Sequence, residues 1–202
     1  MKSCSFCDRD TKKTRIIAES KSAYIMPTFG QISDGGHVLL ISKEHLPCFG
    51  ALGRKGLEEL DVFKKKVEGA VRKNYGPTVC FEHGIIGQTV PHAHFQILPS
   101  STDLFQTLSQ KYPFYRKLGN LADLEGVYND RRVYLYYENQ ENKKFAFIMD
   151  AIPQYMRFVA AEAIGNAPRG DWKAWRADPD CARKDDELIL ETVRELKREL
   201  GK

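Results

Sequence analysis

The sequence of 202 residues lacks any long apolar run and any recognisable export signal. A membrane-spanning helix needs about 20 mostly apolar residues, so we expect no membrane partner. Met1-Lys2-Ser3 runs directly into a cysteine pair, where a signal peptide would carry a basic and then an apolar region. The five cysteines are an odd number and, apart from Cys4 and Cys7, are spread widely along the chain. These features favour metal binding over disulfides and predict a reducing, cytoplasmic compartment.

The sequence also has little excess charge of either sign. Its 31 Lys and Arg residues against 27 Asp and Glu residues give a net charge of +4. This mild excess is compatible with a nucleotide or RNA partner, but a strong nucleic-acid footprint would be more basic and more clustered. We interpret the densest basic run, Lys64-Lys65-Lys66, as a solvated helix face. No repeat, low-complexity segment or linker is evident, so the length predicts one generous domain or a core with an extension.

Two histidines and a glutamine occupy alternate positions near the middle of the chain. On an extended strand alternate side chains share a face, so His92, His94 and Gln96 would line one face together. The residues between and after them are apolar and would turn into a core: Ala93, Phe95 and Ile97. Three polar groups in a row indicate a site rather than a solvated edge.

This row has the chemistry needed to handle a phosphate. A neutral imidazole can attack a phosphoryl centre near neutral pH and then leave again. A carboxamide can donate a hydrogen bond to a phosphate oxygen, and the preceding Gly87-Gln88-Thr89 supplies a turn, an amide and a hydroxyl. The alternative is a strand with two surface histidines, which is the better interpretation of an isolated H-x-H. The flanking Gly-Gln-Thr and the closing Ile-Leu-Pro favour the site.

Residues 87–99 resemble the signature of the histidine triad (HIT) superfamily, H-φ-H-φ-H-φ-φ preceded by G-Q-[ST]-V, where φ is apolar. Here the third histidine is glutamine. The resemblance implies that His94 is the nucleophile and becomes nucleotidylated, while Gln96 and Thr89 contact the phosphate together with backbone amides near Gln88. With glutamine at the third position, the motif resembles that of the branch that holds galactose-1-phosphate uridylyltransferase and the diadenosine tetraphosphate phosphorylases. That departure leaves open whether water or another acceptor takes the nucleotide.

The pair Cys4-Ser5-Phe6-Cys7 has the spacing of two metal-ligating thiolates or of a redox pair. The redox interpretation needs a following helix, and residues 8–13 carry no apolar stripe. Two histidines elsewhere in the chain, His45 and His92, can complete a metal site. Resemblance to uridylyltransferase-type HIT proteins implies that Cys4, Cys7, His45 and His92 bind a structural zinc. Cys48 could replace one ligand, and two reduced, unliganded thiols are the other alternative.

Hydrophobic periodicity predicts an α+β fold in the first half. We expect short strands within 14–26, a strand over 37–42, a helix over 55–74, and strands over 78–81 and 92–98. The order agrees with the antiparallel sheet and packed helices of the HIT fold, which the resemblance implies. We therefore predict a HIT core over residues 1–102 with an N-terminal zinc knuckle. His37 is predicted to be buried at a strand start, and His83 to be solvated on a loop.

Residues 103–202 predict a C-terminal α+β extension packed on that core. We expect a helix within 103–118 whose extent Pro113 limits, a hairpin of 132–137 with 144–149, a helix over 153–164 and a charged helix over 185–200. This order, with Gln154-Tyr155-Met156-Arg157 at a helix start and Asp171-Trp172 after it, resembles the C-terminal extension of CwfJ-type HIT proteins. Those relatives are linked to RNA processing.

Two functions follow from these expectations. The first is a nucleotide hydrolase or nucleotidyltransferase that acts on nucleoside phosphate anhydrides, with dinucleoside polyphosphates as the first choice, through a nucleotidyl-histidine on His94. The alternative is a HIT-fold nucleotide- or RNA-binding module in RNA processing with little catalysis. Three tyrosines on the predicted hairpin favour the binding module only if they stack on bases, and cross-strand packing is the commoner role of such residues. They are Tyr134, Tyr136 and Tyr137. A homodimer is a further expectation, because many HIT proteins pair.

Overall fold

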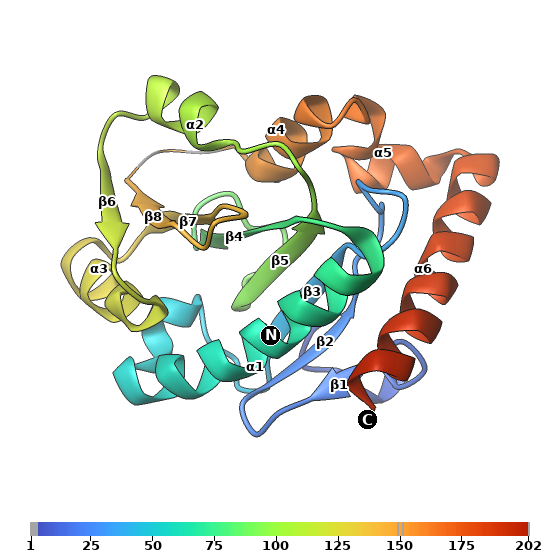
Figure 1. Cartoon of the computed structure of the whole chain (residues 1–202), viewed down its shortest axis with the longest axis horizontal. Coiled ribbons are helices and arrows are strands. Elements are labelled where there is room, and N and C mark those ends of the chain that lie inside the picture. The colour runs from blue at the N-terminus through green and yellow to red at the C-terminus, as the bar shows by residue number, and fades with distance from the viewer. Residues whose placement is uncertain (1–3, 149, 151, 202) are drawn as a thin grey trace.

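All strands among the described residues join one antiparallel sheet in the computed structural model, which describes residues 4–148, 150 and 152–201 (Figure 1). The strand order is β1-β2-β3-β5-β4-β7-β8-β6. The strands are β1 (Ala18–Glu19), β2 (Ala23–Pro27), β3 (Val38–Ser42), β4 (Thr78–Gly84), β5 (His94–Pro99), β6 (Tyr115–Leu118), β7 (Tyr134–Glu138) and β8 (Lys144–Phe147).

The α-helices are α1 (Arg54–Tyr75), α2 (Phe105–Lys111), α3 (Leu124–Arg131), α4 (Tyr155–Ala163), α5 (Trp172–Ala177) and α6 (Pro179–Leu200). Four short 3-10 helices accompany them: η1 (Asp10–Lys12), η2 (Phe49–Leu52), η3 (Leu121–Asp123) and η4 (Ala167–Arg169). The predicted α+β class, an antiparallel sheet with packed helices, is confirmed. None of the helices in the described part of the chain is long and apolar enough to cross a membrane.

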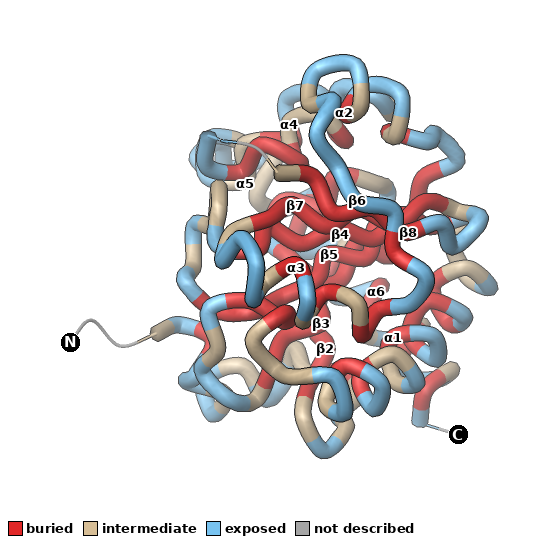
Figure 2. Tube along the Cα trace, turned by 90° about the vertical axis from the view of Figure 1, so that its left-hand side faces the viewer, coloured by how far each residue is buried: buried red, intermediate tan, exposed pale blue. Residues whose placement is uncertain are grey.

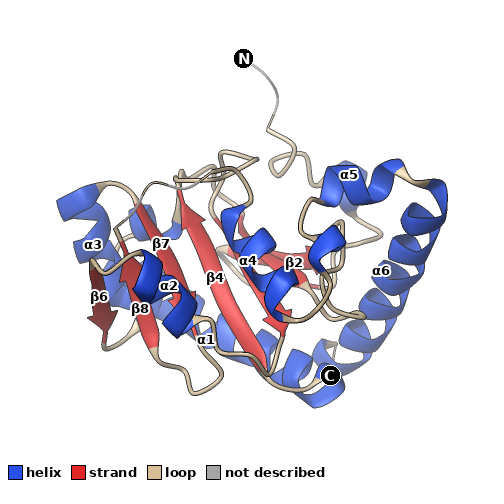
Figure 3. Ribbon diagram, turned by 90° about the horizontal axis from the view of Figure 1, so that it is seen from above, coloured by secondary structure: helices blue, strands red, loops and turns tan. Residues whose placement is uncertain are grey.

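The two faces of the sheet are covered by different elements. The α1 face carries the larger apolar cluster, formed with α1, η3, α3 and the end of α6. On the α4 face, α2 and α4 pack over β4, β7 and β8 (Figure 3), whereas the N-terminal segment packs over β2 and β3 through Phe6. Strands β2, β3, β4, β5, β7 and β8 therefore form the buried centre of the molecule, whereas most of β6 is exposed (Figure 2).

The second half of the chain extends the sheet of the first half. β7 pairs with β4, and their register places Phe81 opposite Tyr137. A buried ion pair crosses the same boundary, since the Lys64 ammonium of α1 contacts Glu68 of the same helix and Glu138 of β7. The division into a core over 1–102 and an extension over 103–202 stays a prediction, but the strands on its two sides belong to one sheet.

Three expectations need correction. The helix expected within 103–118 ends at Lys111, and Tyr115–Leu118 is a strand. Pro113 explains the break, because it disfavours the helical conformation of the preceding residue, and Tyr112 has φ −128° and ψ 85°. The interpretation of Lys64 as solvated is wrong, since it is fully buried between two carboxylates. His83 lies within β4 and is buried, not on a solvated loop.

Other boundaries shift by a few residues. The final helix begins at Pro179, six residues before its predicted start, because Asp178 caps it by accepting hydrogen bonds from the backbone N–H groups of Asp180 and Cys181. The strand predicted over 92–98 begins at His94. In the second hairpin strand, regular structure ends at Phe147, and Met149 lies outside the described residues.

Candidate functional site

Strand β5 directs His94 and Gln96 onto the α4 face of the sheet. The alternate residues Ala93, Phe95 and Ile97 belong to the apolar cluster on the α1 face, as the two-residue period of a strand requires. His94 and Gln96 are almost buried, at 7% and 4% exposure, and both line the same cavity. The row therefore combines a packed inner side with a polar side that faces a pocket.

The His94 ring is held in one orientation by its own main chain. Its Nδ1 lies 2.7 Å from the carbonyl oxygen of His92. Because a carbonyl can only accept, Nδ1 carries the proton and Nε2 keeps its lone pair. The edge of the Phe6 ring packs against the imidazole, with centroids 5.3 Å apart. Burial lowers the pKa of His94 to about 4, and the nearby His92 and Arg157 add to this effect, so the ring is neutral at pH 7.

The cavity in front of this row has a volume of about 240 Å³. Apolar side chains from β2, β3, the N-terminal segment and the loop before β5 form part of its wall: Phe6, Met26, Leu39 and Val90. Thr89 contributes to the lining from the loop before β5. The side chain of Gln88 turns elsewhere, donating from Nε2 to the Pro47 carbonyl at 2.8 Å, and does not line the cavity. A nucleotide-sized ligand would meet an apolar wall and a polar floor.

The second half of the chain supplies two lining residues, Arg157 from α4 and Trp172 from α5. Trp172 stacks on Phe29 at the mouth of the cavity, with ring centroids 6.1 Å apart. Two guanidinium groups lie over the Phe29 ring, that of Arg15 at 3.9 Å and that of Arg176 at 4.6 Å. The mouth is therefore aromatic and basic.

The sequence analysis did not identify Arg157 or Trp172 as site residues. Arg157 is a single charge within the apolar stretch Tyr155–Ala161, and a lone charge on such a helix face is a signal for a buried, paired or ligand-facing group. In the sequence Trp172 stands out only as part of the Asp171-Trp172 pair after α4. No local pattern indicates that Trp172 lies near His94, because that contact depends on tertiary packing.

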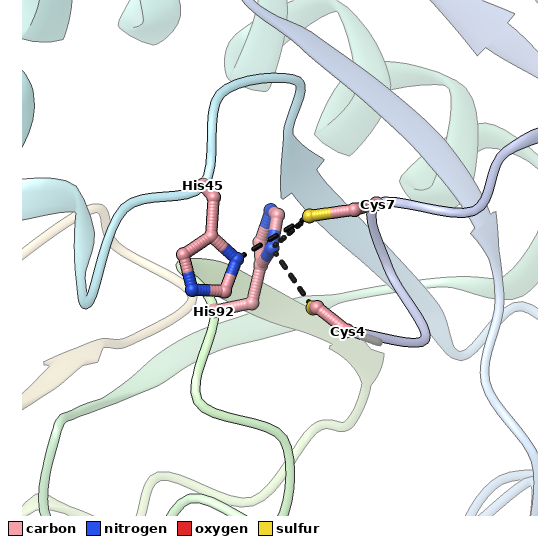
Figure 4. Close-up of side chains that lie close together, drawn as sticks. All are labelled: Cys4, Cys7, His45 and His92. Atoms are coloured by element: carbon pink, nitrogen blue, oxygen red, sulfur yellow. Dashed lines mark hydrogen bonds between the residues drawn. The ribbon is translucent and has the colours of Figure 1, made fainter. Parts of the chain in front are cut away.

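Cys4, Cys7, His45 and His92 come together at the N-terminal knuckle, and their ligand atoms all lie within 4.8 Å of one another (Figure 4). Cys4 Sγ lies 3.4 Å from His92 Nδ1, and Cys7 Sγ lies 3.3 Å from His45 Nδ1 and 3.7 Å from His92 Nδ1. Bonds of about 2.0–2.3 Å in a tetrahedron place neighbouring ligand atoms about 3.3–3.8 Å apart. These three distances fit a metal ion at the centre.

The orientation of His92 supports the same conclusion. Its Nε2 lies 2.8 Å from the Ser42 carbonyl oxygen, so Nε2 carries the proton and Nδ1 faces the two thiols with its lone pair. Metal-ligating histidines commonly donate their other ring N–H to such an acceptor. Cys48 is not part of the cluster: it is buried in the apolar core beside η2, where burial raises the pKa of its thiol to about 12. The four-residue cluster could hold a metal ion.

The other two histidines, His37 and His83, do not line the cavity. His37 is buried as predicted, and Gln31 bonds both its backbone N–H and its carbonyl. Burial lowers the pKa of the His37 ring well below its usual range. His83 Nε2 accepts a hydrogen bond of 3.1 Å from the backbone N–H of Met156, in the first turn of α4. His83 therefore links the strand beside β5 to the helix that carries Arg157.

The antiparallel sheet with packed helices, and the position of His94 and Gln96 on one cavity, agree with the histidine triad resemblance of residues 87–99. Residues 1–116 match a family model described as "Protein similar to CwfJ C-terminal", and the chain belongs to that family. The match includes the whole of the predicted HIT core and ends within β6.

Among curated proteins, the chain is similar to the nitrilase and fragile histidine triad fusion protein NitFhit of Caenorhabditis elegans. The two are 31% identical over 88 residues, which is 42% of this chain. The similar segment spans 20% of the length of that relative.

Two solved structures are also similar. A hypothetical protein from Leishmania major is 28% identical, with a TM-score of 0.43, over 50% of this chain and 75% of that one. A hypothetical histidine triad nucleotide-binding protein from Sulfolobus tokodaii strain 7 is 16% identical, with a TM-score of 0.46, over 98% of this chain and 97% of that one.

Proposed function

We propose that this protein is a nucleotidyl hydrolase or nucleotidyltransferase in which His94 is the nucleophile. The observation that carries the proposal is the position of the His94 ring: it lines the cavity while its Nδ1–H is bonded to the His92 carbonyl. The nitrogen that remains, Nε2, has the lone pair that attack on phosphorus requires. Gln96 and Thr89 line the same cavity and are the proposed phosphate ligands.

The reaction we propose has two steps. In the first, Nε2 of His94 attacks the phosphorus of a nucleoside phosphate anhydride, the P–O bond of the anhydride breaks, and the leaving phosphate takes the electron pair. The ring becomes cationic, and its Nδ1–H bond to the His92 carbonyl stabilises that charge. In the second, an acceptor oxygen attacks the same phosphorus and the P–N bond breaks. The nucleotide is thereby transferred to water or to a phosphate-bearing acceptor.

Dinucleoside polyphosphates are the proposed substrate class, which rests on the resemblance to the HIT superfamily. The apolar wall formed by Met26 and Leu39 and the aromatic mouth formed by Phe29 and Trp172 suit a ligand with flat apolar groups on either side of charged phosphates. Backbone amides near Gln88 remain proposed phosphate donors, although the Gln88 side chain is turned to Pro47.

For the metal cluster we propose a structural zinc held by Cys4, Cys7, His45 and His92, a donor set of two thiolates and two imidazoles that suits this ion. When bound, zinc supplies a fixed tetrahedral junction and no chemistry at the substrate. His92 connects the two sites, because its ring belongs to the cluster and its carbonyl accepts from His94. The knuckle thus helps to fix the orientation of the proposed nucleophile.

The test is trapping of the covalent intermediate. We expect wild-type protein incubated with radiolabelled diadenosine tetraphosphate and denatured without acid to carry labelled nucleotide, because a phosphorus–nitrogen bond is acid-labile. His94→Ala should carry none and lose at least about 1,000-fold in turnover, while nucleotide binding survives. His83→Gln is the matched control, since glutamine keeps an acceptor for the Met156 N–H and the residue does not line the cavity. Label or turnover retained in His94→Ala would refute the assignment.

A second candidate function is a binding module for nucleotides or RNA, which the basic, aromatic mouth of the cavity favours. The three hairpin tyrosines give this candidate no support. They are fully buried, and their hydroxyl groups donate to carboxylates of Glu82, Glu138 and Asp103. RNA binding with a steep salt dependence, together with no trapped nucleotide, would favour the module.

A further inference from the structure

Arg157 is a buried cation without a partner of opposite charge at ion-pair distance. The residue is 4% exposed, and none of the ion pairs between described residues includes it. Its guanidinium is held by backbone carbonyls instead. Nη2 donates to Gly30 at 2.6 Å and to Arg169 at 3.1 Å, and Nε donates to Gly170 at 3.2 Å. Carbonyl dipoles orient the group but do not neutralise its charge.

The remaining nitrogen, Nη1, has no bond to a backbone carbonyl. A guanidinium has five N–H groups, and the three bonds to carbonyls leave the two on Nη1. One of them approaches Oε1 of Gln96 at 3.4 Å, which is a long contact. Because Arg157 and Gln96 both line the cavity, Nη1 retains donor capacity toward any ligand in it.

The nearest carboxylates are committed elsewhere. Asp185 accepts hydrogen bonds from the backbone N–H groups of Gly30 and Gln31 and pairs with Arg176. Asp171 caps α5 by accepting from the first backbone N–H groups of that helix. Burial lowers the pKa of Arg157 to about 10, with Asp185 and Asp171 opposing that effect from a distance, so the group is charged at neutral pH. A buried charge of this kind favours an anion in the adjoining cavity.

We propose that Arg157, contributed by the second half of the chain, binds a phosphate oxygen of the nucleotide that occupies the His94 cavity. Its contact with Oε1 of Gln96 also assigns that oxygen as the acceptor end of the Gln96 amide. The site would thereby discriminate a nucleoside phosphate from the nucleoside. The location of this phosphate rests on the proposed function, but the binding itself requires no reaction at His94.

The experiment compares two ligands that differ only in the phosphate. Binding of AMP and of adenosine is measured by calorimetry for wild-type protein, Arg157→Met and Arg169→Met. We expect Arg157→Met to lower the ratio of AMP affinity to adenosine affinity about 10- to 100-fold, the range of one charge-assisted hydrogen bond. Arg169 is the matched control, because it is similarly buried and bonded to backbone carbonyls but pairs with Asp34 and does not line the cavity. Its variant should keep the wild-type ratio.

Two further measurements test the proposal if Arg157→Met does not fold. Arg157→Lys keeps the charge without the planar fork and should give an intermediate ratio. Replacing sodium chloride by sodium phosphate at matched ionic strength should raise the melting temperature of wild-type protein more than that of Arg157→Lys, because the general stabilisation by phosphate is common to both and only a bound anion distinguishes them.

The proposal is overturned if Arg157→Met and Arg169→Met change the ratio equally, if wild-type protein binds AMP no better than adenosine, or if phosphate stabilises wild-type protein and Arg157→Lys equally. Its failure is distinct from failure of the proposed function. His94→Ala tests turnover and the trapped adduct, whereas the affinity ratio does not depend on either.

Discussion

The two halves of this chain contribute to one site in different ways. The first half holds the proposed nucleophile, its neighbour Gln96 and the metal cluster within segments that have a recognisable local pattern. The second half provides Arg157 and Trp172, and its Asp185 holds the loop at Gly30 and Gln31 from α6. Local pattern thus accounts for the groups expected to do chemistry. The groups that complete and shape the cavity come from packing between distant segments.

The largest expected loss of stability comes from removing the buried ion pair that joins the two halves of the chain. We expect Lys64→Met to reduce the free energy of unfolding by about 3–5 kcal/mol, because it leaves the buried Glu68 without its ion-pair partner and Glu138 with Lys144 alone. Urea unfolding measures the change. The control is Lys65→Met in the same basic run, whose exposed pair with Asp61 should contribute about 1 kcal/mol or less. Equal losses in the two variants would contradict the assigned role of Lys64.

A second contact between the halves should respond to pH. Glu82 of β4 accepts from the Tyr134 hydroxyl of β7 and from the Phe49 N–H, and burial raises its pKa from 4.5 to about 8. Since the folded-state pKa is the higher one, its stabilisation is complete below about pH 4.5 and is lost as the pH rises through about 8.

Between pH 5 and pH 9 we therefore expect wild-type protein to lose about 2–4 kcal/mol of unfolding free energy relative to Glu82→Gln, at about 1.4 kcal/mol per pKa unit. Glu58→Gln, at an exposed position of α1, should follow the wild-type curve. Parallel curves for wild-type protein and Glu82→Gln would show that the Glu82 carboxyl does not titrate in this window.

Metal removal tests the first half of the chain alone, because all four proposed metal ligands lie in that half. We expect purified protein to hold about one zinc per chain and Cys7→Ser to lose most of it. Bound metal stabilises the folded state by about 2.7 kcal/mol when its free concentration is 100 times the dissociation constant, so a chelator should lower the melting temperature by several degrees. Cys181→Ser is the control, because that thiol lies on α6 away from the cluster. Full metal content in Cys7→Ser would contradict the proposed ligand set.

Sequence reasoning was most accurate where the physics is local. The alternation over residues 93–97 correctly assigned Phe95 and Ile97 to the core and His94 and Gln96 to the cavity, because a strand has a period of two. Apolar spacing located α1 to within one residue at each end. The metal cluster assembled as the resemblance implied, with the assignment of zinc and of the catalytic roles still to be tested.

Sequence reasoning failed where the contacts of a residue come from distant segments of the chain. Lys64 follows the pattern of a surface lysine, and only the arrival of Glu138 from β7 makes its burial favourable. His83 sits beside glycines and was interpreted as part of a loop, but pairing of β4 with β7 extends the strand through it. The helix α3 carries a weak apolar signal and was not anticipated, since its buried residues Leu124 and Val127 are defined by contact with η2 and β7.

The pairing of β4 with β7 has a practical consequence for anyone who dissects this protein. Strand β5 pairs with β4 over Thr78–Phe81, and β7 pairs with its other edge over Cys80–Gly84. A fragment cut near residue 102 would lack β7 and would leave the β4 edge that pairs with it exposed. Unpaired strand edges tend to associate with other chains. Oligomers or aggregates of such a fragment would therefore report on the cut, and the intact polypeptide is the unit to assay.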